Sequence, residues 1–180
     1  MHIDVIYESL YGNTAAIAKA IAEGIHEAAP NATVEVHEAS EPPHVAANPD
    51  DLVVLGGPTH AWRMSTAATR RNAPRRPGGA NADATTRRLG VREVISELTR
   101  TSRPCRAATF DTRLGVRWSG GASRQIARQL RRAGYEIVAR PEGFVVTSTV
   151  GPVAPGELDR ASQWGYQLAR ELVVSGNGAS

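Results

Sequence analysis

The sequence predicts a three-layer α/β fold built on a parallel sheet. Apolar runs typical of strands alternate with amphipathic stretches typical of helices along all 180 residues. Hydrophobic residues make up 41% of the chain and charged residues 22%, which is the range of globular proteins. There is no internal repeat and no linker that would separate two domains. Residues 1–180 are therefore expected to form a single domain.

Three strands and one helix are expected in the first third of the chain. Ile3–Tyr7 has the composition of a strand, and Thr33–His37 alternates apolar and polar residues as an edge strand does. Leu52–Leu55 is apolar throughout, which suits a strand buried on both faces. Asn13–Ala29 contains isoleucines at every fourth position, so these should line one face of a helix.

The rest of the chain is expected to add three helices and two strands. In order these are helix Val91–Thr101, strand Arg106–Phe110, helix Ala122–Ala133, a fifth strand in two pieces, Ile137–Val138 and Phe144–Val146, and helix Glu157–Val174. Gly134 is a stop signal for the second of these helices, and Pro141 interrupts the fifth strand. The residues of the last helix that we expect to be buried are Leu158, Ala161, Trp164 or Gly165, Leu168 and Leu172.

Several classes of protein are excluded by what the sequence lacks. No apolar run approaches the roughly 18 residues of a membrane span, and the N-terminus lacks the order of a signal peptide, so we expect a soluble cytoplasmic protein. Cys105 is the only cysteine, which excludes an internal disulfide and a cysteine-based metal centre. His2, His26, His37 and His44 have no metal-ligand spacing. We expect them at the surface and predict no metal site.

Charge is segregated along the chain although the formal net charge is only +3. Residues 1–60 carry nine acidic residues and one lysine, whereas residues 61–140 carry 18 arginines and five acidic residues. An arginine-rich segment favours an acidic or polyanionic partner. There is no aromatic interleaving and no nucleic-acid motif, so we do not expect a nucleic acid to be that partner.

The loop after the first strand has the parts of a phosphate site. Ser9–Thr14 contains hydroxyls at both ends and a glycine, and it leads directly into a predicted helix N-terminus. The Lys-containing loop of nucleoside triphosphatases and the three-glycine fingerprint of dinucleotide-binding proteins are both absent from the sequence. Helix capping by Asn13 and Thr14 is the alternative explanation.

Two later loops resemble each other in composition. Gly56–Ser65 and Asp111–Gly121 each follow a predicted strand, and each contains glycines and one tryptophan, Trp62 or Trp118. Glycines let the backbone approach a flat ligand, and an indole offers an aromatic plane. Because the carboxyl ends of parallel strands share one edge of a sheet, the three loops together predict a site for a planar ring with a phosphate tail.

These motifs resemble the flavodoxin family, whose members bind FMN. The resemblance rests on YESLYGNTAAIAKAIAEGI, VVLGGPTHAWRMS, TFDTR and GPVAPGELDRASQWGYQL, which span nearly the whole chain. Tyr11 replaces the middle hydroxyl of the usual phosphate loop, as in the WrbA-type quinone-reductase branch. The resemblance implies a flavodoxin-like doubly wound fold with a five-stranded parallel sheet in the order 2-1-3-4-5.

The resemblance also implies a set of FMN-binding residues. Those expected to hold the phosphate are Ser9, Leu10, Tyr11, Gly12, Asn13 and Thr14. Those expected to contact the flavin ring from one side are Pro58, Thr59, His60, Ala61 and Trp62, and from the other side Asp111, Thr112 and Arg113. No catalytic residue is expected, because the flavin itself carries the electrons.

The expected function is electron transfer through non-covalently bound FMN, with a redox partner protein. The alternative is an FMN-dependent reductase that takes electrons from NAD(P)H and passes them to a quinone or another small acceptor. A third hypothesis is a flavin-less fold that binds a polyanion through its arginines. Flavodoxins are acidic around the flavin, whereas this chain has arginines such as Arg63, Arg70 and Arg71 after its second flavin loop. An acidic partner and a less negative reduction potential are therefore expected, and residues 72–86 form a substrate lid, a docking surface or a disordered loop.

Overall fold

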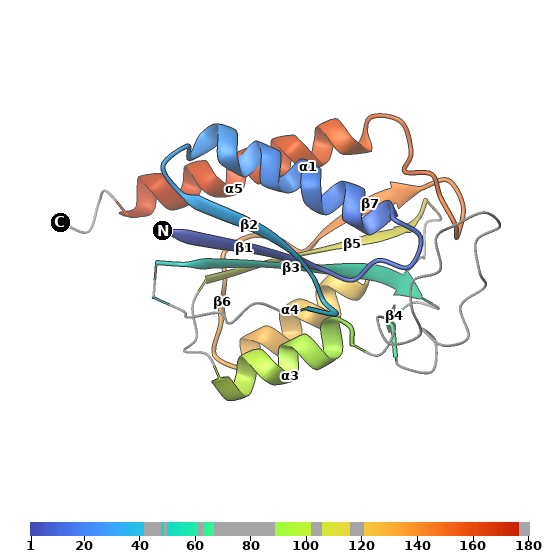
Figure 1. Ribbon diagram of the computed structural model, residues 1–180, viewed down its shortest axis with the longest axis horizontal. Helices are drawn as coiled ribbons and strands as arrows, with labels where there is room; N and C mark the ends of the chain where they lie inside the picture. Colours follow the sequence, from blue (N-terminus) through green and yellow to red (C-terminus); the bar gives the residue numbers. More distant parts are fainter. Residues whose placement is uncertain are drawn as a thin grey trace.

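The computed structural model has three layers, as the sequence predicts. Helices α1 (Asn13–Ala28) and α5 (Glu157–Gly176) cover one face of a central sheet, and α3 (Val91–Thr101) and α4 (Ala122–Arg132) cover the other (Figure 1). The structure describes residues 1–41, 48, 50–60, 63–66, 89–101, 106–115 and 121–176. None of the described helices has the length and apolarity that a membrane crossing requires.

The sheet has the expected strand order. Its hydrogen-bonded path runs β2-β1-β3-β5-β6, and β7 pairs with β5 beyond β6. The strands are β1 (His2–Tyr7), β2 (Thr33–Glu38), β3 (Leu52–His60), β4 (Arg63–Met64), β5 (Arg106–Leu114), β6 (Glu136–Ile137) and β7 (Glu142–Val146). Since β6 and β7 pair with successive parts of β5, they are the two pieces of the expected fifth strand. The short β4 was not expected, and it pairs antiparallel with the end of β3.

Each face of the sheet carries its own apolar cluster. Successive residues of a strand point to opposite faces, so Ile3 and Val5 pack with α1 and α5, whereas Ile6 packs with α3 and α4. Ile17, Ile21 and Ile25 of α1 are all completely buried in the cluster beneath α1 and α5, as their spacing predicts. Phe110 and Phe144 meet edge to face in the same cluster, at a centroid distance of 6.4 Å.

The last helix packs closely against the first. A Cβ on Gly165 would overlap the backbone of Ile21, and a Cβ on Gly24 would overlap the backbone of Ser162. Glycine is therefore required at both positions for the two helices to approach each other this closely. The expectation that Leu158 is buried was wrong, because its side chain is 45% exposed in the first turn of α5.

Strands β3 and β5 extend further than the sequence predicts, and this extension carries site residues. Gly56 to Pro58 were expected in a loop, but they continue the parallel pairing with Phe110 to Thr112. The ring of Phe110 lies where a Cβ on Gly56 would be, so the glycine that indicates a turn in the sequence instead makes room for a core aromatic. The loop prediction for Asp111 to Arg113 was wrong for the same reason, since β5 continues to Leu114.

Candidate functional site

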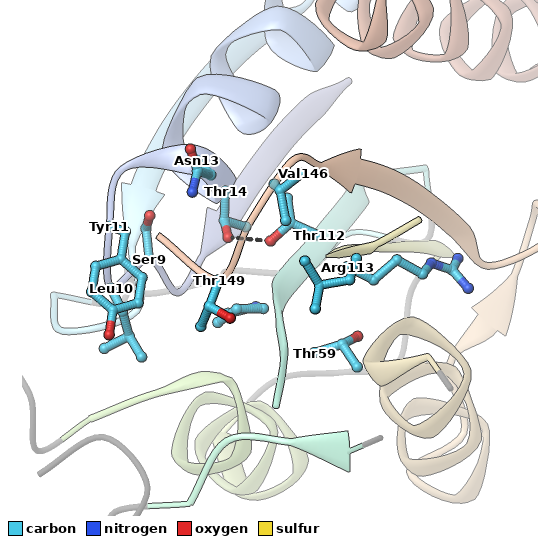
Figure 2. Close-up of a pocket in the computed structure, with 12 residues that line it drawn as sticks. Ser9, Leu10, Tyr11, Asn13, Thr14, Thr59, Thr112, Arg113, Val146 and Thr149 are labelled. Carbon is cyan, nitrogen blue, oxygen red and sulfur yellow. Dashed lines mark hydrogen bonds between the residues drawn. The ribbon is translucent and has the colours of Figure 1, made fainter. Parts of the chain in front are cut away.

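A cavity of about 150 Å³ lies at the carboxyl edge of the sheet. It is bordered by the loop before α1, by the ends of β3 and β5, and by the end of β7 with the turn that follows it (Figure 2). The residues that line it are Ser9, Leu10, Tyr11, Asn13, Thr14, Pro58, Thr59, Thr112, Arg113, Leu114, Val146 and Thr149. The loop before α1 and the segments around Pro58 and Thr112, which the sequence predicts to meet, therefore border the same cavity.

The loop before α1 ends in an N-terminus without a side-chain cap. Gly12 adopts a left-handed conformation, with φ at 86°, which a residue with a side chain rarely adopts. Its N–H group donates to Ser9 Oγ at 3.0 Å, and its carbonyl accepts the first helical hydrogen bond from Ala16. The first turn of α1 contains no acidic residue, so the positive end of the helix dipole is not neutralised from within the helix.

Two buried hydroxyls join the start of α1 to the end of β5. Thr14 Oγ1 and Thr112 Oγ1 lie 2.9 Å apart, and the two residues are 2% and 5% exposed (Figure 2). Both also line the cavity. The helix N-terminus and the strand end are thus held in contact beside the same space.

Two buried carboxylates, those of Glu8 and Asp111, connect the site to α3 and α4. Glu8, which precedes the first loop, accepts a hydrogen bond from the N–H group of Val91 at the start of α3, at 3.1 Å. Asp111 Oδ2 accepts hydrogen bonds from the N–H and the hydroxyl of Ser123 in the first turn of α4, at 2.9 and 2.8 Å. Carboxylates are favourable at helix N-termini, so each acid stabilises one helix against the sheet.

Asp111 is completely buried and forms an ion pair with Arg113, whose Nε lies 3.0 Å from Asp111 Oδ1. Burial raises the pKa of the Asp111 carboxyl above its ordinary value, while Arg113 and the Ser123 hydrogen bonds lower it in part. The side chain of Arg113 packs over Gly143 of β7, where any Cβ would overlap the guanidinium group. The charge of Arg113 is therefore paired with Asp111 at the base of the site.

The structure brings nine of the expected site residues to the cavity wall, and places others away from it. Gly12 and Asp111 are described but do not line the cavity. His60 ends β3, and the position of its side chain lies outside the described residues. Ala61 and Trp62 lie outside them altogether, as do Trp118, Cys105 and residues 72–86.

Sequence reasoning missed Leu114, Val146 and Thr149 as cavity residues. A signal for two of them existed, because Val146 ends a predicted strand and Thr149 lies in the turn after it. The rule that ligands bind at the carboxyl ends of parallel strands applies to the fifth strand as it does to the other strands.

The lining groups suit a phosphate ester. They include several hydroxyls, the uncapped start of α1 and the side chain of Arg113, and none of the described residues that form the wall is a carboxylate. The described cavity is smaller than the 300–1,000 Å³ of typical small-molecule sites, so by itself it has room for a small polar group rather than for a large ring system. Residues 61–62 and 116–120, which follow β3 and β5 in the sequence, lie outside the described part of the chain.

Comparisons with known proteins agree with this fold. Residues 4–70 match the family model of the flavodoxin domain. No curated protein matches the chain. The structure is similar to flavodoxin 1 from Bacillus cereus, with a TM-score of 0.63, 18% identity, and coverage of 97% of this chain and 98% of that one. It is also similar to a flavodoxin from the domain Archaea, with a TM-score of 0.58, 20% identity, and coverage of 96% and 99%.

A flavodoxin, WrbA-like protein from Agrobacterium tumefaciens is a further structural neighbour, with a TM-score of 0.53, 14% identity, and coverage of 96% and 98%. Identities this low establish a shared fold. The resemblance to flavodoxins is therefore confirmed, by a family match over residues 4–70 and by a flavodoxin-like fold over nearly the whole chain.

Proposed function

We propose that this protein binds FMN non-covalently at the carboxyl edge of its sheet and transfers electrons to or from a redox partner protein in the cytoplasm. The observation that carries the proposal is the uncapped N-terminus of α1 beside the buried hydroxyl pair of Thr14 and Thr112. The family match covers the loop that contains Ser9 and Thr14.

The phosphate end of the ligand fits the first loop. A terminal phosphate carries up to two negative charges, and free N–H groups at a helix N-terminus stabilise such an anion without a basic side chain. The side chains of Ser9 and Thr14 both line the cavity and add hydroxyl donors (Figure 2). Among the described residues that line the cavity, none belongs to a second helix N-terminus that could hold a pyrophosphate, so FMN fits this part of the site better than FAD.

When bound, the flavin supplies a ring that accepts and releases electrons. The chain's own residues bind and orient it and exclude water. Tyr11 from the first loop and Leu114 from β5 provide partly exposed apolar surface next to the cavity, suited to contact with the ring. His60, which ends β3, and Trp62, two positions later in the sequence, are proposed to contact the ring.

The test is a binding experiment followed by rapid mixing. The purified protein is stripped of any flavin and titrated with FMN, riboflavin and FAD by calorimetry. FMN should bind more tightly than riboflavin or FAD, because only FMN places a terminal phosphate at the start of α1. Equal affinity for FMN and riboflavin would contradict the assignment of the phosphate site.

The FMN complex is then mixed with NADH and with NADPH in a stopped-flow spectrometer. An electron carrier is expected to stay oxidised over the time in which a reductase turns over. Fast reduction by either nucleotide, followed by reoxidation with a quinone, would contradict the carrier role and identify the protein as a reductase.

A further inference from the structure

Four side chains of types that bind metals lie close together on the paired strands β1 and β2, and none of them lines the cavity. His2 and Asp4 lie two residues apart on β1, and Glu35 and His37 lie two residues apart on β2. Ile3 and Val5, which alternate with the β1 pair, pack against α1 and α5. The four polar side chains therefore lie on the opposite face of the sheet, the face of α3 and α4.

His2, Asp4 and Glu35 each offer a ligand atom within 4.8 Å of those of the other two, and His37 Nε2 lies beside both carboxylates. Asp4 Oδ1 lies 3.1 Å from His2 Nε2 and 3.3 Å from His37 Nε2. Glu35 Oε2 lies 3.2 Å from His37 Nε2 and 3.9 Å from His2 Nε2. Nitrogen and oxygen ligands about 2.0–2.2 Å from a tetrahedral Zn²⁺ lie roughly 3.3–3.6 Å from one another. Small side-chain shifts would bring His2, Asp4 and Glu35 to such separations, and His37 would add a fourth ligand if its ring moved toward that of His2.

Charge provides a separate argument. Asp4 and Glu35 are direct partners in the pairing of β1 with β2, and like charges in facing positions destabilise a sheet. Asp4 is also only 3% exposed, so its charge has little compensation from water. One divalent cation would neutralise both carboxylates.

We propose that His2, Asp4, Glu35 and His37 bind one divalent transition-metal ion, with Zn²⁺ as the occupant that best fits two imidazoles and two carboxylates. Four protein ligands leave no open position, so the ion is structural and ties the edge strand β2 to β1. The side chains of His2 and Glu35 are 38% and 50% exposed, which gives the ion a path from solvent.

The backbone supports this geometry. The N–H group of His2 donates to Asp51 Oδ1 at 2.8 Å, which holds the start of β1 against the start of β3. Asp4 lies three residues before the end of β1 at Tyr7, and Ser9 lies in the loop beyond that end. The proposed metal site shares no residue with the cavity wall, so either site can fail without the other.

The test is titration of tag-free, chelator-treated protein with Zn²⁺ by calorimetry near neutral pH. We expect one ion per chain. Glu35→Gln and His37→Ala should each weaken binding by at least about tenfold, since ligand loss costs no less than loss of a supporting residue. His26→Ala is the matched control, because His26 is exposed on α1 and lies outside the cluster; its affinity should equal that of the wild type.

A second readout uses Co²⁺ in place of Zn²⁺. Tetrahedral coordination by nitrogen and oxygen should produce visible absorption bands that Zn²⁺ displaces. Asp4→Asn changes a buried residue and risks misfolding, so the half-exposed Glu35→Gln variant carries the test. Absence of saturable binding in the wild type, or an unchanged affinity in both Glu35→Gln and His37→Ala, would overturn the proposal.

Discussion

Thr14 and Thr112 are 98 residues apart in the sequence, yet their hydroxyl oxygens lie 2.9 Å apart in the fold. In such a pair one hydroxyl donates its proton to the other, and the accepting hydroxyl keeps its own proton. Both residues line the cavity at the start of α1. The pair therefore holds one hydroxyl donor in position for a ligand while neither oxygen is left without a partner.

Replacing Thr14 by valine should weaken FMN binding by about ten- to a hundredfold, since a hydrogen bond to a charged group contributes roughly 1.5–3 kcal/mol. Valine preserves the shape of the side chain, and Thr14→Ser is the matched control that restores the hydroxyl. Calorimetric titration with FMN and with riboflavin checks this. The loss should be confined to FMN, and an equal loss for riboflavin would show that the variant acts through packing and not through the phosphate.

Replacing Trp62 by alanine should restore part of the flavin fluorescence of the FMN complex, because an indole stacked on the ring quenches emission. Stacking contributes on the order of 0.5–1.5 kcal/mol beyond the buried area, so FMN affinity should also fall by a few fold to about tenfold. Steady-state fluorescence at saturating FMN is the measurement, with Trp164→Phe as the control, since Trp164 packs against Phe110 and Phe144 in the core. If emission is the same with and without Trp62, this residue does not contact the flavin.

Replacing Glu157 by glutamine should destabilise the protein at neutral pH by about 1.5–3 kcal/mol. Hydrogen bonds from Arg160 hold the pKa of the Glu157 carboxyl below its ordinary value, and the N–H group of Val145 adds a hydrogen bond of 2.7 Å to Oε2. A carboxyl with a lowered folded-state pKa contributes stability above its unfolded pKa, near 4.5, and loses it as the pH falls through the folded value.

The difference between wild type and Glu157→Gln should therefore be large at pH 7 and should shrink in acid. Urea unfolding at several pH values measures it. Asp159→Asn is the control, because Asp159 is exposed in the same turn of α5. A difference that does not change with pH would mean that Glu157 stabilises the fold through shape alone.

Replacing Gly165 by alanine should destabilise the protein by about 1–3 kcal/mol, although alanine is the better helix former. The added Cβ would overlap the backbone of Ile21 and force α1 and α5 apart. Glu23→Ala on the exposed side of α1 is the control and should be nearly neutral. Thermal unfolding compares the two, and a Gly165→Ala variant as stable as the wild type would mean that the helices can move apart freely.

Most of the fold could be predicted from the sequence because its signals are local and periodic. The spacing of Ile17, Ile21 and Ile25 specifies a buried helix face, and all three are completely buried. The alternation of strands and helices specifies the layers. The first loop could be identified as a site because its glycine, its hydroxyls and a helix start are neighbours in the chain.

The features that could not be predicted depend on contacts between distant residues. Gly56 indicates a turn when it is considered alone, and only the ring of Phe110 shows why a strand passes through it. Asp111 begins a stretch with the composition of a ligand-binding loop. In the fold its carboxylate is buried and accepts a hydrogen bond from Ser123 in α4, which is a structural role. His2 and His37 have no metal-ligand spacing in the sequence, and only parallel pairing of β1 with β2 brings both to Asp4.

Because β3 and β5 continue into the site, part of the cavity wall is ordered before a ligand binds. Pro58 and Thr112 are paired across the sheet, so their backbone is ordered by the sheet and not by the ligand. Ordering one residue of a free loop costs about 1–2 kcal/mol, and a ligand that orders such a loop binds correspondingly more weakly. This part of the cavity is preorganised, so the free energy of its contacts with a ligand is available for affinity.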